Sequence, residues 1–386
     1  METTMLTCIY CDSEEFESGR GSEEHVILSS LGGKKGSKNI CCQTCNNKYG
    51  DEIDEKLSKE LSFFSTMLGI TTGRNKSAPT QNRIVSHSGK NYDISSGGSF
   101  KLSKADVKIT DRDDLNGQEI SITADNEKQA LNILNQVLEK FNKSIDDFQS
   151  LDAKSVRSYI PTVHQRISLG GEKQHRSIVK MMLTYAATLM SPERLRSGCF
   201  SEVIEYIKGN NPSYDGIQFD TVTTFPEEPT LDVVNHRIFF IASESLKLAV
   251  GLIEIYGKLR FSAVLSDEWE GVSLGKAYAV DPVSGHQDNI EFNVTDELFS
   301  SLSERYLDVN SYKNSIGQLI EVFQKRQTDE VISKISKKAI DRHMVGKGEY
   351  ITKEMIAQVS QEIALEFVRF SERLETIEDI DLKNEI

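Results

Sequence analysis

Four cysteines near the start of the chain have the spacing of a metal site. Two Cys-x-x-Cys pairs, Cys8/Cys11 and Cys42/Cys45, are separated by thirty residues. Each pair fits the tight turn that supplies two thiolates to a tetrahedral zinc ion. Cys41 adjoins the second pair, but only Cys42 keeps the two-residue gap to Cys45. We therefore expect a structural zinc site, with reduced cysteines or a redox pair as the alternative.

Polar residues between and beside these pairs are of types that a zinc site does not need. Glu24 and His25 lie near the centre of the segment, Asn39 precedes the second pair, and Asn46 follows it directly. A neutral imidazole can accept a proton near pH 7. Glu and Asn oxygens are ligands that Mg²⁺ or Mn²⁺ accepts, whereas thiolates suit softer metals. The segment thus carries groups for chemistry as well as for structure.

In combination, these residues resemble the HNH (His-Me finger) endonuclease family, and most of all its subgroup with two zinc knuckles. The resemblance covers residues 8 to about 57 and is carried by Cys-Ile-Tyr-Cys, Glu-Glu-His-Val-Ile-Leu, Leu-Gly-Gly and Asn-Ile-Cys-Cys-Gln-Thr-Cys-Asn-Asn-Lys-Tyr-Gly. It implies a ββα-metal fold that holds one divalent ion beside a scissile phosphate. Leu28 departs from the pattern, because family members commonly have Pro there.

The resemblance also implies a role for each matching residue. His25 would be the general base that activates water, and Asn39 would fix its imidazole. Asn46 and Glu24 would bind the catalytic Mg²⁺ or Mn²⁺ ion. Glu23 adjoins Glu24 and is an alternative ligand.

The residue Asp54 recurs in the similar subgroup, and the sequence leaves its role open between a helix cap, a partner of His25 and a metal ligand. Histidine also has a plainer explanation at position 25, as a hydrogen-bonded residue of a zinc-ribbon fold. Glu24 also has a plainer, structural explanation, because the adjacent Glu23 could serve as the acidic ligand instead.

Local sequence patterns predict the helices and strands of this segment and of the residues that follow it. We expect a helix after an Asp51 cap, strands over residues 101–109 and 118–123, and a helix capped by Asp125 or Asn126. Further helices are expected over residues 175–190 and 199–208. Four strands should come next, within residues 237–280, and mostly helix from residue 295.

The charge distribution leaves the partner open. The formal net charge is −14, which is unusual for a protein that binds nucleic acid. Basic residues nevertheless gather in two stretches, 61–90 and 154–180. These stretches are either chance features of an acidic, solvated surface or patches that contact phosphate. The candidate nucleic-acid contacts are Arg74, Lys76, Arg83, Arg166, Lys173, Arg176 and Lys180.

The length of 386 residues predicts two or three domains. We expect an α+β protein with four parts: a zinc-stapled nuclease module (1–66), a linker with a small strand–strand–helix unit (67–150), an α+β accessory domain (151–294) and a helical C-terminal region (295–386). No apolar run reaches membrane-span length, and the N-terminus lacks a signal pattern, so we expect a cytoplasmic protein.

The sequence thus predicts a metal-dependent endonuclease that hydrolyses DNA and is regulated or targeted by the rest of the chain. The order of elements in residues 68–282 loosely resembles that of bacterial HNH proteins found near anti-phage genes, which implies antiviral defence. The apolar spacing of the C-terminal helices is compatible with internal packing, a homodimer or a larger defence complex. The alternatives are a non-catalytic zinc-ribbon interaction module and an RNase that uses the same finger.

Overall fold

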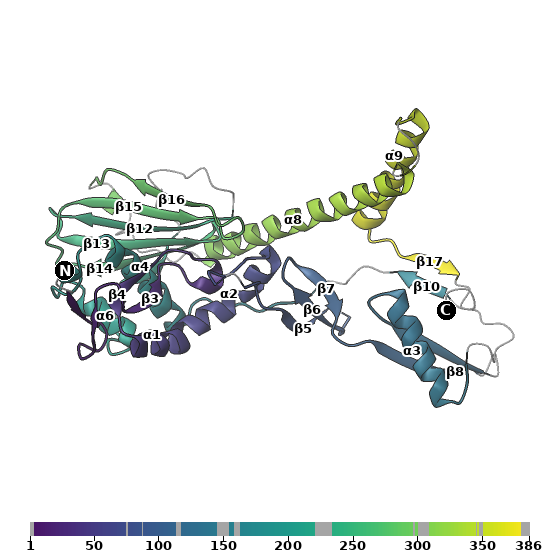
Figure 1. The fold of residues 1–386 in the computed structure, drawn as a ribbon, viewed down its shortest axis with the longest axis horizontal. Helices are drawn as coiled ribbons and strands as arrows, with labels where there is room; N and C mark the ends of the chain where they lie inside the picture. The colour runs from purple at the N-terminus through teal and green to yellow at the C-terminus, as the bar shows by residue number, and fades with distance from the viewer. Residues whose placement is uncertain are drawn as a thin grey trace. The chain divides into compact units, whose positions relative to one another are not determined.

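The chain passes repeatedly between two compact units (Figure 1). In the computed structural model, the first unit holds residues 1–80, 95–98 and 166–323, and the second holds 81–94, 99–165 and 324–386. The residues described are 4–74, 76–86, 88–112, 117–144, 154–157, 163–220, 234–295, 298–299, 309–344, 346 and 350–379. Because the protein mixes helices and strands throughout, its class is α+β, as predicted.

The first unit is built on a six-stranded antiparallel sheet of order β11–β14–β13–β12–β15–β16. Its strands are β11 (Ile217–Phe219), β12 (His236–Ser243), β13 (Leu248–Ile255), β14 (Leu259–Ser266), β15 (Leu274–Val280) and β16 (Gln287–Glu291). The four predicted apolar strands are confirmed as β12 to β15, while the edge strands β11 and β16 were not predicted. Tyr256 and Gly257 both have positive φ, the geometry of a type I′ hairpin turn between β13 and β14.

The helix α4 (Glu172–Thr188) packs against the sheet and is buried on all sides. Its residues 176–186 are all buried, because the sheet lies on one side and the N-terminal segment on the other. At Gly251 of β13 a Cβ would lie 2.7 Å from Met182 Cβ, so only glycine lets the helix approach this closely. Two shorter helices follow, α5 (Pro192–Leu195) and α6 (Ser201–Lys208).

The N-terminal segment folds as two hairpins and a long interrupted helix. The strands are β1 (Met5–Thr7), β2 (Glu15–Glu17), β3 (Ser22–His25) and β4 (Gly36–Cys41), and the helical pieces are η1 (Ser29–Leu31), α1 (Gln43–Tyr49), the π-helical η2 (Gly50–Asp54) and α2 (Glu55–Leu68). The prediction of a helix start at Asp51 is wrong. The helix begins at Gln43, capped by Cys42, because the second cysteine pair itself forms the first turn.

One hydrophobic core joins this segment to the sheet and α4. It runs from Cys8 and Ile9 through Phe64 of α2 to Tyr256 of the sheet. Tyr256 Oη lies 2.8 Å from Ser65 Oγ, so polar contacts also cross between α2 and the sheet. The segment is therefore an integral layer of the first unit.

The second unit contains small sheets and helices. Its strands are β5 (Gln81–Val85), β6 (Asn91–Ser95), β7 (Ser99–Leu102), β8 (Asp106–Arg112), β9 (Gly117–Thr123), β10 (Lys154–Arg157) and β17 (Thr376–Asp379), and its helices are α3 (Glu127–Lys140) and α9 (Lys353–Ser371). A further helix, α8 (Val309–His343), starts in the first unit and ends in this one. Asn126 caps α3 as predicted, but the single strand expected over 101–109 is two strands, β7 and β8.

Among the described helices, none is long and apolar enough to span a bilayer.

Candidate functional site

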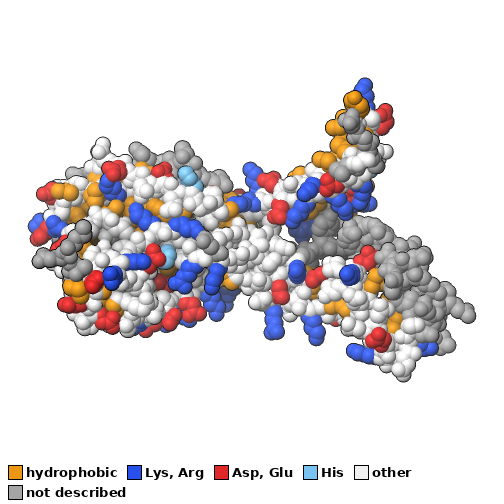
Figure 2. All heavy atoms as spheres, viewed as in Figure 1, with side chains coloured by type: hydrophobic (Ala, Val, Ile, Leu, Met, Phe, Trp, Pro, Cys, Tyr) orange, Lys and Arg blue, Asp and Glu red, His pale blue; other side chains and the backbone are white. Residues whose placement is uncertain are grey.

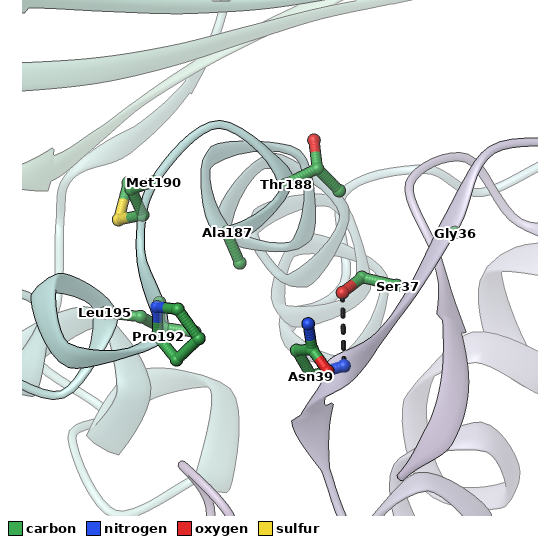
Figure 3. Close-up of a pocket in the computed structure, with 8 residues that line it drawn as sticks. All are labelled: Gly36, Ser37, Asn39, Ala187, Thr188, Met190, Pro192 and Leu195. Carbon is green, nitrogen blue, oxygen red and sulfur yellow. Dashed lines mark hydrogen bonds between the residues drawn. The ribbon is translucent and has the colours of Figure 1, made fainter. Parts of the chain in front are cut away.

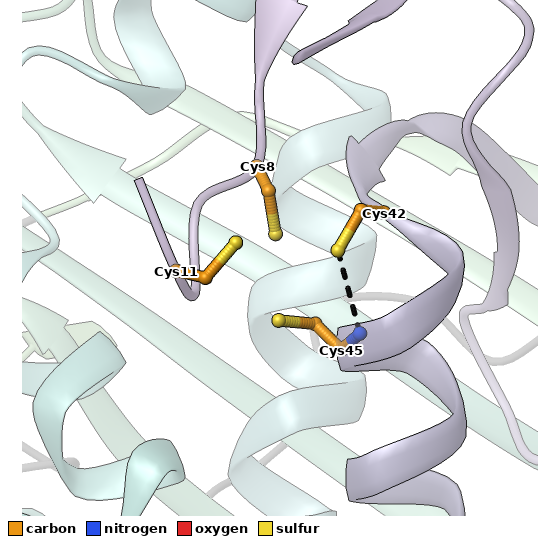
Figure 4. Close-up of side chains that lie close together, drawn as sticks. All are labelled: Cys8, Cys11, Cys42 and Cys45. Atoms are coloured by element: carbon orange, nitrogen blue, oxygen red, sulfur yellow. Dashed lines mark hydrogen bonds between the residues drawn. The ribbon is translucent and has the colours of Figure 1, made fainter. Parts of the chain in front are cut away.

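The four predicted zinc ligands come together in space (Figure 4). Their sulfur atoms all lie within 4.8 Å of one another, although Cys8 and Cys11 follow β1 while Cys42 and Cys45 open α1. Burial and the neighbouring cysteines raise the pKa of Cys45 above its usual value, so a cation is needed to hold this thiol as a thiolate. A tetrahedral zinc ion fits this donor set, and it would join the two hairpins to the helix.

The neighbouring thiol of Cys41 lies outside the cluster. Cys41 is fully buried, and its Sγ is 3.9 Å from Glu24 Oε2. The expectation that Cys42, and not Cys41, completes the second pair is confirmed.

His25 lies at the end of β3, where the chain enters the loop that connects β3 to β4. His25 pairs with Gly36 of β4 and is half-buried, and no hydrogen bond to its ring is found among the described residues. Burial lowers the pKa of His25, Arg74 and Lys180 act in the same direction, and Glu23 and Asp54 oppose them. The ring is therefore neutral at pH 7 and able to accept a proton.

Glu23 lies on the same side of the hairpin as His25, and Asn46 of α1 contacts the start of β3. The exposed Glu23 side chain lies beside Gly36, because a Cβ added at Gly36 would be 3.1 Å from Glu23 Cγ. Gly36 is the residue of β4 that pairs with His25. Asn46 of α1 donates from Nδ2 to Ser22 Oγ (2.7 Å) and to the Glu23 carbonyl (3.0 Å). These bonds fix the amide while its Oδ1 has no partner among the described residues, so this oxygen remains able to bind a cation.

The carboxylate of Glu24 points to the other side of the hairpin, since successive strand residues alternate in direction. It is 3% exposed and forms an ion pair with Lys180 Nζ of α4. The same ammonium lies 2.8 Å from Asp54 Oδ2, and Asp54 Oδ1 accepts from Ser177 Oγ at 2.7 Å. Glu24 is thus held by a protein cation, away from the open side that carries His25.

Asn39 also lies away from His25. Its Oδ1 accepts a hydrogen bond from the Gly19 amide at 2.6 Å, and its carbonyl accepts one from Arg196 at 3.1 Å. Figure 3 shows Asn39 and Ser37 facing a small hollow against the end of α4. The structure therefore does not bring Asn39 to the imidazole that it was expected to fix, and its contacts hold the β1–β2 and β3–β4 hairpins together.

Two of the predicted nucleic-acid contacts are wrong. Lys180 is 1% exposed and Arg176 is 6% exposed, with Arg176 donating to the Ile207 carbonyl at 2.8 and 3.0 Å. The two side chains do share a helix face, but this face is buried against other parts of the unit. Neither side chain can reach a phosphate backbone. The other five predicted contacts are exposed: Arg74, Lys76, Arg83, Arg166 and Lys173.

A group of lysines on β4 and its approach was not predicted from the sequence. Lys38 of β4 is exposed. Lys34 donates to the Thr72 carbonyl at 3.3 Å, which brings the loop that carries Arg74 next to the hairpin. Figure 2 shows Lys and Arg side chains gathered on the face of the first unit that carries this hairpin. The Lys34-Lys35 pair after two glycines was the available sequence signal.

The oxygen donors on the open side suit a small hard cation only in part. Among the described residues, the four cysteines are the one group of three or more Cys, His, Asp or Glu side chains that could hold a metal. Mg²⁺ commonly takes only one or two carboxylates and keeps several waters. Glu23 on the open side can supply one such carboxylate, whereas Glu24 is occupied by Lys180.

Comparison with known proteins agrees with the geometry. Residues 8–62 match the HNH endonuclease family. No curated protein and no solved structure matches the chain. The matched residues include the four-cysteine cluster, the β3–β4 hairpin with His25, and the helix that follows. Residues 8–62 are therefore similar to the HNH endonuclease family in sequence.

Proposed function

We propose that this protein is a metal-dependent endonuclease that hydrolyses phosphodiester bonds in DNA, with His25 as the general base. The observation that carries the proposal is the His25 ring, which has a lowered pKa and no hydrogen bond among the described residues, at the end of the family-matched hairpin. A neutral imidazole in this position can take the proton of an attacking water.

The residues around His25 have complementary tasks. Arg74 supplies positive charge near the imidazole, and exposed Lys38 adds a second cation on β4 that could contact a phosphate backbone. Glu23 and Asn46 would hold the Mg²⁺ or Mn²⁺ ion, which when bound supplies charge stabilisation to the pentacovalent phosphate. As water attacks, a phosphorus–oxygen bond forms, His25 takes the water's proton, and the bond to the leaving oxygen breaks.

The test is plasmid cleavage in Mg²⁺ by the wild type and by His25→Ala. Loss of a general base should lower the rate by roughly 10²–10⁴-fold, while zinc content and melting temperature stay near the wild-type values. The control is His164→Ala, which removes an exposed histidine of the second unit. Undiminished cleavage by His25→Ala would contradict the proposal.

The substrate is tested by offering plasmid, single-stranded DNA and RNA of matched sequence side by side. We expect His25-dependent cleavage of the plasmid. Cleavage of RNA alone would replace the proposal with an RNase, and no cleavage of any substrate would favour a binding module. A role in antiviral defence stays a prediction from the sequence.

A further inference from the structure

We propose that Lys180 is a positioning residue of the nuclease site. Its ammonium lies between Glu24 and Asp54 and so holds β3 and the helical segment η2 together. This inference rests on the proposed function. It concerns a residue outside the family-matched segment, since Lys180 belongs to α4 and the match ends at residue 62.

The three charged groups form a closed cluster inside the first unit. The side chains of Lys180 and Glu24 are 1% and 4% exposed, and that of Asp54 is 14% exposed. Burial alone lowers the pKa of Lys180, but Asp54 and Glu24 outweigh it and raise the pKa overall, so the ammonium is charged. A buried ammonium that lost its carboxylates would be strongly disfavoured, so the three groups depend on one another.

The cluster joins the elements that carry the proposed catalytic groups. Glu24 directly precedes His25 on β3, and Asp54 ends the π-helical turn that continues the helix of Asn46. The imidazole has no hydrogen bond of its own among the described residues. Its position is therefore set by the backbone of β3, which Lys180 fixes through Glu24. Ser177, one turn earlier on α4, adds a second bond to Asp54.

The cluster also separates two possible positions for the catalytic cation. The family resemblance implies that the acidic residue before the histidine binds the metal, yet here Lys180 already neutralises that residue. We infer that the divalent ion uses Glu23, which lies on the open side with His25, and that Glu24 positions β3 instead of binding the metal. The two assignments predict opposite responses to Mg²⁺.

The experiment measures kcat, KM and the half-saturating Mg²⁺ concentration for plasmid cleavage by the full chain. The variants are Lys180→Met, Lys180→Arg, Glu24→Gln and Glu23→Gln. We expect Lys180→Met to lower kcat by up to about 10²-fold with little change in KM, because a base displaced by about 1 Å loses that much. Lys180→Arg, which keeps the charge, should recover part of kcat. Glu23→Gln should raise the half-saturating Mg²⁺ concentration, and Glu24→Gln should leave it unchanged.

Two results would overturn the inference. The first is a wild-type kcat in folded Lys180→Met. The second is a change in the half-saturating Mg²⁺ concentration, either a lower value for Lys180→Met or a higher value for Glu24→Gln. Either change would mean that Lys180 occupies the position of the metal ion. Both results leave the proposed function intact as long as His25→Ala is inactive.

A folding failure of Lys180→Met is covered by a second variant. The double variant Glu24→Gln/Lys180→Met removes one charge of each sign, so it avoids an unpaired buried carboxylate at position 24. We expect it to melt cooperatively and still show a lowered kcat. A folded double variant with wild-type kcat would equally refute a positioning role for Lys180.

Discussion

His236 shows how single residues connect the N-terminal segment to the sheet. It is fully buried, with Nδ1 accepting from the Tyr256 amide at 3.1 Å and Nε2 donating to the Leu31 carbonyl at 2.9 Å. The two bonds define one neutral tautomer and link the turn after β3 to strand β12. Burial lowers the pKa of His236 to about 4, although Leu31 and Asp281 oppose this shift.

The lowered pKa of His236 predicts a pH-dependent stability. Because the folded pKa lies below the ordinary value, stability is complete above about pH 6.5 and falls by up to about 1.4 kcal/mol per pH unit as the pH drops toward 4. Urea titrations at several pH values measure the slope.

The control is His236→Gln, whose amide can both accept and donate but does not titrate. We expect its free energy of unfolding to fall less steeply over the same pH range. Equal slopes for the variant and the wild type would show that other groups dominate this pH range.

At the scale of elements, the zinc cluster connects the first hairpin to α1. Cys8 and Cys11 follow β1, and Cys42 and Cys45 open α1. A zinc ion would add a link to the ring contact of Tyr10 with Tyr49 and to the Thr44–Glu14 hydrogen bond between the same segments.

Removing one ligand should destabilise this layer. Structural zinc is worth on the order of 10 kcal/mol in small zinc-finger peptides, so Cys45→Ser should lose zinc and lower the melting temperature markedly. Metal analysis and calorimetry measure both quantities.

Cys199→Ser is the matched control, because this half-buried thiol lies outside the cluster. It should keep zinc at the wild-type ratio and change the melting temperature little. If Cys45→Ser keeps its zinc, the cluster is not the zinc site.

A second prediction at the scale of elements concerns the packing of α4 against β13. A side chain at position 251 would press on Met182, whose Cβ would lie 2.7 Å from the added atom. We expect Gly251→Ala to lower the free energy of unfolding by about 1–3 kcal/mol, as overpacked cores do. Urea denaturation measures the change, and Gly317→Ala on α8, where an added Cβ meets nothing, is the control.

At the scale of the whole molecule, charge is distributed unevenly. The chain carries a net charge of −14, yet exposed Lys38 lies on β4, and exposed Arg74 and Lys76 lie in the loop that Lys34 contacts. Under the proposed function, binding of DNA would depend on this local basic surface within an acidic protein, and salt should weaken it.

The dependence of DNA binding on salt tests this surface. In the His25→Ala background, Lys38→Ala and Arg74→Ala should each weaken DNA binding and reduce the slope of log affinity against log salt by about 1. Lys313→Ala on α8 removes an exposed charge elsewhere in the first unit and is the control. Fluorescence anisotropy at several salt concentrations gives the slopes, and equal slopes for all variants would remove this face from the binding site.

Local patterns were enough to predict much of this protein. The Cys-x-x-Cys spacing predicted all four members of the sulfur cluster, and the apolar runs predicted strands β12 to β15. Asp125 or Asn126 was predicted as a helix cap, and Asn126 is the cap, because its side chain accepts from an amide three residues later. The segment that resembles the HNH family agrees with the family match to residues 8–62. Each of these features depends on neighbours in sequence.

The features that the sequence did not determine depend on packing between distant segments. It could not choose between Glu23 and Glu24, because the side of the hairpin that becomes buried is decided by α4, more than 140 residues later. For the same reason Arg176 and Lys180 looked like surface charges, although Lys180 stands among apolar residues in a helix that is buried all round. Sequence determined the residue types and local elements of this site, and the tertiary structure decided which charges face solvent and which face each other.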